Sequence, residues 1–581
     1  MRHPGVPDRW CRDLLSCAWN PLAESTGLLL VYHLVAVNCR YSHSCLALFY
    51  LRQALEHHVP GCRIRLSQYT LNDPYYRTLL ELTGSETDAL FFSVYIWNHA
   101  YVRRLVSDLA TVRPDLPLIL GGPQAPELSG LPAKATVVQG EIEGIGESFY
   151  DDLVSGKLRP VYRAEGRPSF SSPYRKQDFD TALHNRQVYY ESSRGCPFSC
   201  AYCLSSITRG VRHLDMGQVR RELALILEAE PKIVKFVDRT FNTDLQRTLE
   251  LWRYLAGLST CTRFHFEVAP DRFPPWLLDF LQTVPAGRFQ FEVGLQSFTP
   301  EALQAVDRQM DPEAAAEHVR YLVSLDTIHI HADLILGLPF ETAASFRSSF
   351  NRLFALAPHH LQLGLLKILP GTRLAGRCRE FGLIHCDQPP YEILATRWLD
   401  HGTLRYLYGF CNCVELFHNN RFFPSFWRYL RNTGEEPFAF FTSLLDLAQA
   451  ERFFSQAPTH ALLNRLLVKI VQSRSDRDLV LDLLRFDWLR CGYRFLPPEL
   501  DGPELNKVRR RLRLQLPQNM AGLYSYTDRE EFFKQTIFLP LGGAAVKELR
   551  LGDGRQDGIV CLLPAMTAGV RSYRQAVLLA V

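Results

Sequence analysis

Two hydrophobic patterns alternate along the first part of the chain. Continuous apolar runs rich in β-branched and aromatic residues, such as LLLVYHLVAV from Leu28 and ALFFSVYIW from Ala89, predict buried strands. Between them, segments such as YVRRLVSDLATV (101–112) repeat apolar residues at helical spacing. Buried strands that alternate with amphipathic helices are typical of a parallel sheet covered on both faces. We therefore predict an open, doubly wound α/β domain over residues 27–157.

Sheets of this kind bind ligands in the loops at the carboxyl ends of their strands. The expected loops are residues 38–43, 95–99, 121–124 and 140–146. Gly121 and Gly122 have no side chains and would let a ligand approach the backbone closely, but the same pair also suits a tight turn after a strand. Both interpretations stay open at this point.

A second βα series follows a linker rich in Pro, Ser and Arg at residues 158–186. Between residues 187 and 371 we expect six strands separated by helices, which begin near Val188, Ile233, Arg263, Arg288, Ile328 and His360. Successive βα units with right-handed crossovers build a barrel, and eight units close it. Six units predict a partial (β/α)6 barrel.

Three of these strands have one polar and one apolar face. In RFHFEVA (263–269), RFQFEVGLQS (288–297) and IHIHADLIL (328–336), the alternation has a period of two. Because an ordinary barrel fills its interior with Val, Ile and Leu, we expect the apolar faces to lie under the helices and the polar faces, with Glu292, to line a lumen that holds ligand. An antiparallel sheet with one wet face would alternate in the same way, but the intervening helices argue against it.

The βα rhythm stops after Gly371. Residues 372–581 are rich in Leu, Phe and Arg at helical spacing and predict a mostly helical C-terminal domain. Cys411, Cys413 and His418 could bind a metal there, but three ligands without an obvious fourth are more typical of buried thiols. Residues 1–26 form an extension of unclear status without the features of a secretory signal, so we expect a cytoplasmic protein.

Composition excludes several classes of protein. Apolar residues make up 47% and charged residues 22%, as in folded globular proteins. The formal net charge of +4 is too small for a chain of 581 residues to indicate a nucleic acid or a membrane surface as partner. No apolar run reaches the roughly 18 residues of a membrane span. An odd count of 15 cysteines argues against a disulfide framework and for free thiols plus a metal site.

The spacing Cys196-x3-Cys200-x2-Cys203 carries the clearest chemistry. It follows the first expected barrel strand, within ESSRGCPFSCAYC. Three thiolates there can hold three irons of a 4Fe-4S cluster and leave the fourth iron open to a ligand. Structural zinc is the alternative, with His213 as fourth ligand, but zinc sites favour paired Cys-x2-Cys spacing.

With Tyr202 directly before the last cysteine and six βα units around it, this motif resembles the radical S-adenosylmethionine (radical SAM) superfamily. The resemblance implies that Cys196, Cys200 and Cys203 hold the cluster and that S-adenosylmethionine binds its open iron and is cleaved to a 5′-deoxyadenosyl radical. By motif position it also implies cofactor contacts from the backbone of Tyr202, from Glu292, Gln296 and Ser297, and from Gly337 within DLILGLPFET (333–342). The family's Gly-Gly-Glu motif is absent; KFVDRTFN stands in its place, where Asp238 or Asn242 would bind the amino group.

The order of the two domains is similar to the cobalamin-binding class of that superfamily. The segments NCRYSHSCLAL, FFSVYIWN and LQLGLLKILPGT resemble a bacterial branch of the class that carries its own helical C-terminal domain of unknown function. The resemblance implies cobalamin contacts from His43, Gly121 and Gly122. The Asp-x-His-x-x-Gly loop that supplies a cobalt ligand in other cobalamin domains is absent, so His43 is not expected to ligate cobalt.

The resemblance thus implies a radical SAM enzyme, with cobalamin as methyl carrier for methylation of an unactivated carbon. Expected partners are a small-molecule or peptide substrate and an electron donor such as flavodoxin or ferredoxin, with no nucleic acid and no membrane. A cobalamin-assisted rearrangement or cyclisation without methyl transfer is one alternative. A binding or sensing protein that keeps the fold without turnover is another.

Overall fold

A computed structural model describes residues 29–207, 210–516, 528–553, 556–564 and 575–579. The expected extension at residues 1–26 lies outside these ranges. Within them, no helix has both the length and the apolar composition needed to cross a bilayer.

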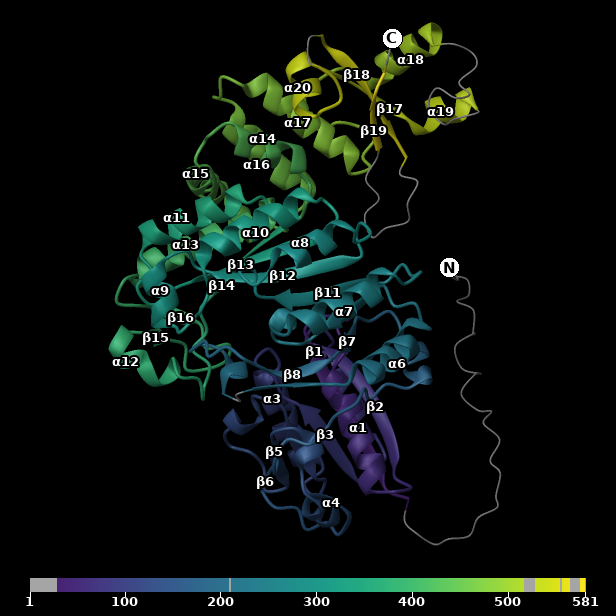
Figure 1. The fold of residues 1–581 in the computed structure, drawn as a ribbon, viewed down its shortest axis with the longest axis vertical. Helices are drawn as coiled ribbons and strands as arrows, with labels where there is room; N and C mark the ends of the chain where they lie inside the picture. The colour runs from purple at the N-terminus through teal and green to yellow at the C-terminus, as the bar shows by residue number, and fades with distance from the viewer. Residues whose placement is uncertain (1–28, 208–209, 517–527, 554–555, 565–574, 580–581) are drawn as a thin grey trace, which may run out of the picture.

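The N-terminal domain is the predicted parallel sheet with helices on both faces (Figure 1). Its strands are β1 (Val31–Asn38), β2 (Arg63–Thr70), β3 (Ala89–Ser93), β4 (Leu118–Gly121), β5 (Ala135–Gln139) and β6 (Val161–Arg163). The helices are α1 (Leu46–His58), α2 (Tyr75–Thr83), α3 (His99–Val112) and α4 (Glu147–Val154). The strand order β2-β1-β3-β4-β5-β6 reverses direction between β1 and β3, and such a switch point opens a crevice at the carboxyl ends of the strands.

Alternate side chains of β1 enter two different hydrophobic cores, which explains its unbroken apolar run. Val35 and Val37 pack with Val102 and Leu105 of α3 in one core. Tyr32 packs on the other face, in the core that also holds Phe149 of α4. A strand buried on both sides has no position for a polar face.

The predicted linker is more ordered than its composition suggested. Residues 161–163 form β6, which extends the N-terminal sheet in parallel to β5. A short helix, α5 (Lys176–Asp180), follows, and its Asp178 forms a buried ion pair with Arg52 of α1 at 2.5 Å. This segment is therefore packed against the N-terminal domain.

The second sheet has six parallel strands in the order β14-β13-β12-β11-β10-β7, as predicted for a partial barrel. The strands are β7 (Val188–Tyr190), β10 (Ile233–Phe236), β11 (Arg263–Val268), β12 (Phe289–Gln296), β13 (His329–Leu336) and β14 (His360–Leu365). The helices between them are α6 (Met216–Leu227), α7 (Leu245–Ala256), α8 (Pro275–Gln282), α9 (Pro300–Ala305), α10 (Pro312–Ser324) and α11 (Ala343–Ala355).

The first barrel strand begins at Val188, as expected, but has only three residues. It ends at Tyr190, and the chain then forms an antiparallel hairpin of β8 (Ser193–Cys196) and β9 (Gly210–His213). Cys196 therefore lies at the end of a hairpin strand and not on the barrel strand itself.

The two faces of β12 are used as predicted. Phe289, Phe291, Val293 and Leu295 are fully buried, whereas the residues between them are only partly buried. Phe291 stacks on Trp252 of α7 with ring centroids 5.0 Å apart. The apolar face thus lies under the helices and the polar face lines the lumen.

The C-terminal part is mainly helical but also contains sheet that the sequence did not predict. Its helices are α12 (Cys378–Phe381), α13 (His401–Phe417), α14 (Pro424–Asn432), α15 (Pro437–Ala450), α16 (His460–Val471), α17 (Arg477–Arg490), α18 (Leu505–Gln515), α19 (Arg529–Gln535) and α20 (Gly543–Glu548). Its strands are β15 (Ile384–His385), β16 (Ile393–Ala395), β17 (Ile537–Leu541), β18 (Gly558–Leu563) and β19 (Gln575–Leu578). The last three pair antiparallel in one small sheet near the C-terminus (Figure 1).

The C-terminal part also covers the edge of the barrel sheet at β14. Helix α13 packs against this strand. Just after α13, Asn419 accepts a hydrogen bond from the backbone N–H of Leu361 (3.0 Å) and donates one to its carbonyl (2.8 Å). An amide side chain thus forms the pair of bonds that a neighbouring strand would form.

Candidate functional site

The cysteine loop begins at a backbone conformation that requires glycine. Gly195 has φ +101°, and a Cβ there would lie 2.1 Å from the carbonyl oxygen of Gly210 on the facing strand. The hairpin can therefore close tightly just before Cys196. From this point the chain runs through Cys200 to Cys203.

The three cysteines form one local cluster with Phe198 and Tyr202. Cys200 is 5% exposed, and Cys196 and Cys203 are half-buried. Burial raises the pKa of the Cys196 thiol, and the nearby Cys203 and Cys200 raise it further. The thiols are thus close enough to repel one another as thiolates, a cost that a bound cationic centre would relieve.

The register of the hairpin bears on the zinc alternative, in which His213 is the fourth ligand. Among the described residues, no three His, Cys, Asp or Glu side chains converge closely enough to hold a single metal ion. In the hairpin, Cys196 pairs with Gly210 and Ser193 with His213, so His213 lies three residues along β9, or roughly 10 Å, from the position opposite Cys196. This register argues against His213 as a fourth ligand beside Cys196. An iron–sulfur cubane, whose cysteines bind separate irons, needs no such convergence.

Asp238, at the end of β10, orients the start of the hairpin. Its carboxylate accepts hydrogen bonds from the Ser192 N–H (3.0 Å), the Ser192 hydroxyl (2.7 Å) and the Ser193 hydroxyl (2.6 Å). Burial raises the pKa of Asp238 to about 6 despite these bonds. The side chain of Asn242 also has hydrogen-bond partners already, because it donates to the Ala269 carbonyl and accepts from the Ala269 N–H. Contact of either residue with the cofactor's amino group stays a prediction.

Glu292 lies in the lumen between two basic groups. Its carboxylate is 3.1 Å from Nε2 of His265 and 3.6 Å from Nζ of Lys235. Burial raises the pKa of Glu292, but His265 and Lys235 outweigh burial and lower it to about 2. The opposite holds for Glu267 on β11, whose pKa is raised to about 7 by burial and by the charge of Glu292. The pKa of Asp333, on the same lumen face, is likewise raised by burial and by the charges of Glu292 and Glu267.

The other predicted cofactor residues lie at the carboxyl ends of β12 and β13. Gln296 has φ +70°, a strained conformation for a non-glycine residue. Ser297 is fully buried and donates to Glu341 Oε1 at 2.8 Å. Gly337 has φ +95°, and a Cβ there would lie 2.9 Å from Ile393. These residues meet at one edge with the cysteine loop, since Arg308 joins the Gly294 carbonyl (2.6 Å) to the Cys200 thiol (3.8 Å).

The carboxyl edge of the N-terminal sheet faces the barrel. The backbone N–H of Gln187, directly before β7, donates to the Ser42 carbonyl in the loop after β1 at 2.7 Å, and burial lowers the pKa of the neighbouring His43. At the switch point, Asn98 donates to the carbonyls of Val37 and Ser93 and ties β1 to β3.

Two features of this edge indicate what shape of ligand it could hold. Tyr95 and Trp97 stack at 4.5 Å, and Trp97 is 44% exposed, which offers a flat aromatic surface beside the switch point. Gly122 serves packing, because a Cβ there would lie 2.6 Å from the Val94 carbonyl. A Cβ on Gly121 would have more room, since the Val138 carbonyl oxygen would lie 3.9 Å from it. The residues thus fit a flat, apolar-faced ligand, and the specific contacts of His43, Gly121 and Gly122 stay predictions.

Sequence reasoning missed the anchor of the cysteine loop. Arg194, next to Gly195, is 2.9 Å from each of three carboxylates, those of Glu141, Glu143 and Glu191. Arg212 on β9 also contacts Glu141, at 2.5 Å. Glu141 and Glu143 belong to the predicted ligand loop 140–146 of the N-terminal domain. No local pattern marks the contacts with Glu141 and Glu143, because these residues lie about 50 positions before Arg194.

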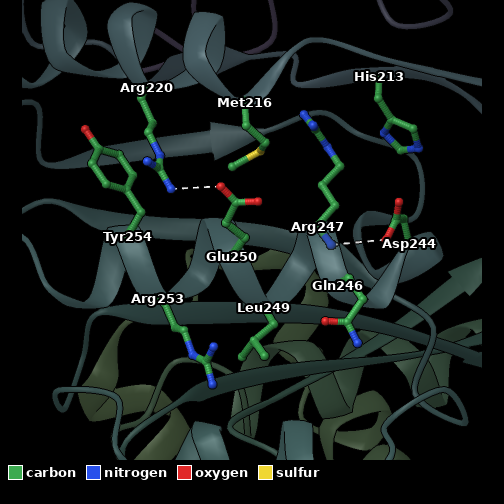
Figure 2. Close-up of a pocket in the computed structure, with 10 residues that line it drawn as sticks. All are labelled: His213, Met216, Arg220, Asp244, Gln246, Arg247, Leu249, Glu250, Arg253 and Tyr254. Carbon is green, nitrogen blue, oxygen red and sulfur yellow. Dashed lines mark hydrogen bonds and ion pairs between the residues drawn. The ribbon is translucent and has the colours of Figure 1, made fainter.

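Two other candidate sites lie elsewhere. Cys411 and Cys413 are buried in the core along α13, where burial raises the pKa of both thiols. A shallow cavity of about 780 Å³ lies on the outer helical layer between α6 and α7. In Figure 2, Arg220 pairs with Glu250, 2.8 Å away, and the backbone N–H of Arg247 donates to Asp244. The guanidinium of Arg247 donates to the Ser192 carbonyl at 3.3 Å. It lies away from the lumen and is not assigned a role.

Comparison with known proteins agrees with this arrangement. Residues 190–353 match the Radical SAM superfamily. Residues 379–532 match DUF4080, described as a protein of unknown function.

Two curated relatives are methyltransferases. The 2-(S-pantetheinyl)-carbapenam-3-carboxylate methyltransferase of Streptantibioticus cattleyicolor is 23% identical over 442 residues, or 65% of this chain and 63% of the relative. The cobalamin-dependent radical SAM methyltransferase TokK of Streptomyces tokunonensis is 25% identical over 332 residues, or 50% of this chain and 48% of the relative. The chain thus spans less than two thirds of the length of either relative.

The fold extends the similarity over nearly the whole chain. The solved structure of the cobalamin-dependent S-adenosylmethionine radical enzyme OxsB with aqua-cobalamin and S-adenosylmethionine bound has a TM-score of 0.55 at 14% identity, and the match covers 91% of this chain and 84% of OxsB. The chain therefore carries a radical SAM domain, and its overall fold is similar to that of a cobalamin-dependent radical SAM enzyme.

Proposed function

We propose that the protein is a cobalamin-dependent radical SAM methyltransferase that methylates an unactivated carbon of a small molecule or peptide. The observation that carries the proposal is the meeting of two edges. The three-cysteine loop follows the first barrel strand, and the ligand-binding edge of the N-terminal sheet contacts its hairpin through Glu141 and Arg194, 2.9 Å apart. The methyltransferase relatives support the same reaction class.

When bound, a 4Fe-4S cluster and S-adenosylmethionine would supply hydrogen abstraction, and cobalamin would supply the methyl group. Cys196, Cys200 and Cys203 would hold the cluster. Arg308, which is largely buried and 3.8 Å from the Cys200 thiol, places a positive charge beside it. That charge would offset negative charge that the site gains on reduction.

In this proposal the lumen residues bind and orient S-adenosylmethionine and the substrate. Glu292 is ionised at neutral pH because its pKa is about 2, so it can accept hydrogen bonds from ribose hydroxyls. Asp333 is held toward its protonated form by burial and by Glu292 and Glu267, so it can donate a hydrogen bond. Its Oδ1 is buried and has no partner, which leaves it available to a bound molecule.

The remaining parts of the proposal concern partners. Reduction of the site requires an electron donor of the flavodoxin or ferredoxin type. Free thiols and an oxygen-sensitive site also suit a cytoplasmic protein. The polar lumen supports a polar substrate without selecting one.

Product analysis tests the reaction class. The full chain is reconstituted anaerobically, reduced, and supplied with S-adenosylmethionine carrying a deuterated methyl group, together with fractionated cell extract as the substrate source. Methylation predicts both S-adenosylhomocysteine and 5′-deoxyadenosine, and a deuterium-labelled product. Formation of 5′-deoxyadenosine alone would instead support rearrangement or cyclisation. Formation of neither, with cofactors bound, would support a binding or sensing protein.

A further inference from the structure

Four partly buried histidines gather near the amino ends of β13 and β14, opposite to the carboxyl ends where the predicted cofactor residues lie. The ring of His331 lies 4.8 Å from that of His329 and stacks on that of His360 at 4.6 Å. The ring of His359 lies 4.8 Å from that of His329 on its other side. Each imidazole in this cluster therefore has another imidazole as a direct neighbour.

The cluster also touches the C-terminal part of the chain. Arg421 follows α13, has φ +59°, and places Nη2 at 2.6 Å from Nδ1 of His329. His360 directly precedes Leu361, whose backbone groups bond to Asn419 just after α13. The histidines thus lie at the contact through which the C-terminal part is held on the last barrel strand.

Two of the contacts require neutral imidazoles. Arginine donates hydrogen bonds and accepts none, so the contact with Arg421 needs a ring nitrogen of His329 that carries no proton. The backbone N–H of Ile330 donates to Nδ1 of His359 at 3.1 Å and needs the same there. Burial lowers the pKa of all four histidines, and for His331, where the neighbouring His360 adds to it, the pKa falls to about 3.

The surrounding charges do not offset a proton gained by the cluster. Arg263 and Arg421 act on it as cations, His265 and His418 as further imidazoles, and Glu292, Asp326 and Glu415 as carboxylates. Glu415 is 4.0 Å from Nε2 of His360 but is 61% exposed, so its attraction is weak. Glu292 is already paired with His265 and Lys235.

We propose that this histidine cluster is a pH-sensitive latch, which holds the C-terminal part on the barrel at neutral pH and releases it as the pH falls below about 6. Release exposes the histidines to solvent, where their pKa returns to about 6.5, so release takes up protons. Groups whose pKa is lowered in the closed form favour that form above about pH 6.5, and this advantage is lost as the pH falls. The inference rests on the fold and does not depend on cofactor binding.

Hydrogen exchange of the full chain without cofactors tests the inference, because the Leu361 N–H bonds to Asn419 across the latch. Exchange is measured by mass spectrometry at two pH values, with labelling times scaled for the slower chemical exchange in acid. Between about pH 7.5 and 5.5, we expect protection of β14 to fall relative to β12 by about tenfold for each histidine that takes up a proton on release.

Variants that cannot take up the proton identify the groups responsible. His329→Gln and His331→Gln should each lose about one tenfold step of this pH dependence, and the double variant should lose about two. His57→Gln, at an exposed histidine of α1, is the matched control and should keep the full wild-type dependence. Equal pH dependence in wild type and in the cluster variants would overturn the inference. Equal loss of protection in β12 and β14 would also overturn it, because the whole barrel would then be unfolding.

Discussion

The guanidinium of Arg194 lies 2.9 Å from the carboxylate of Glu141, so the strand that carries Cys196 is fastened to the N-terminal domain. Arg194 also lies over the rings of Tyr50 and Phe170, which places it between apolar and acidic neighbours. Its side chain is 12% exposed. The domain that we propose for cobalamin and the loop that we propose for the cluster are therefore joined through one side chain.

Loss of this side chain should loosen the cysteine loop. Arg194→Met removes three ion pairs and should cost on the order of 2 to 4 kcal/mol, below the full cost of breaking a buried pair because Glu141 is about one-third exposed. Alkylation of Cys196 by iodoacetamide in the apoprotein, read by mass spectrometry, should accelerate several-fold. Arg77→Met, which removes an exposed ion pair with Glu81, is the control and should change neither rate nor melting temperature measurably. Equal alkylation rates in all three proteins would show that Arg194 does not position the loop.

Iron content should depend on the three cysteines and on no exposed thiol. Anaerobic reconstitution of wild type should give about four irons and four sulfides per chain, and Cys200→Ala should lose most of both. Cys261→Ala is the matched control because Cys261 is exposed. Stoichiometric zinc with no iron uptake in wild type would contradict the cluster assignment.

The two faces of β12 should separate binding from stability. Glu292→Gln removes a charge-assisted acceptor and should weaken binding of S-adenosylmethionine about tenfold or more, the equivalent of about 1.5 to 3 kcal/mol. Phe291→Ala removes a fully buried ring and should cost about 3 to 5 kcal/mol of stability. Isothermal titration and thermal unfolding of both variants check this. An unfolded Glu292→Gln beside a stable Phe291→Ala would reverse the assignment of the faces.

The side chain of His43 should matter little for cobalamin binding. Its backbone carbonyl, and not its imidazole, accepts the described hydrogen bonds from Asn38 and Arg186 that shape the loop. His43→Ala should therefore retain cobalamin through gel filtration and change its absorption spectrum only slightly. Loss of a nitrogen hyperfine signal from the lower face of cobalt in the variant would show instead that His43 is a ligand.

Stability should fall as the pH rises toward 8 because of Glu341. This carboxyl is 1% exposed, and burial raises its pKa from 4.5 to about 8. The folded state keeps a proton that the unfolded state releases between these values, so the free energy of unfolding decreases through this window and levels off above pH 8. In Glu341→Gln the decrease should be smaller by a few kcal/mol, measured by urea unfolding at pH 5, 7 and 9. Parallel curves for the two proteins would contradict the shift.

Periodicity predicted the elements that are long and have distinct faces. The alternation in RFQFEVGLQS identified β12 and its lumen face, and the unbroken run before Asn38 identified β1. Elements without such a signal were missed. Strand β6 has three residues within a Pro- and Arg-rich segment, and β17 to β19 follow long helices and pair only with one another.

The same difference between local and long-range signals applies to the candidate site. Cysteine spacing marked the proposed cluster loop because its three cysteines lie within eight residues of one another. The contacts that fasten the loop, and the contact of Arg421 with His329, join residues from about 50 to about 90 positions apart. Such pairs depend on how the domains meet, which no local pattern encodes.

The two hydrogen bonds between Asn419 and Leu361 have a consequence for solubility. A six-stranded open sheet ends in a strand whose backbone groups can recruit a strand from another molecule, a common start of aggregation. Because Asn419 occupies both groups of Leu361, and α13 packs alongside, the C-terminal region shields that edge. A protein shortened before α13 would expose the edge of β14, and its barrel would tend to associate with itself even if every cysteine and lumen residue were in place.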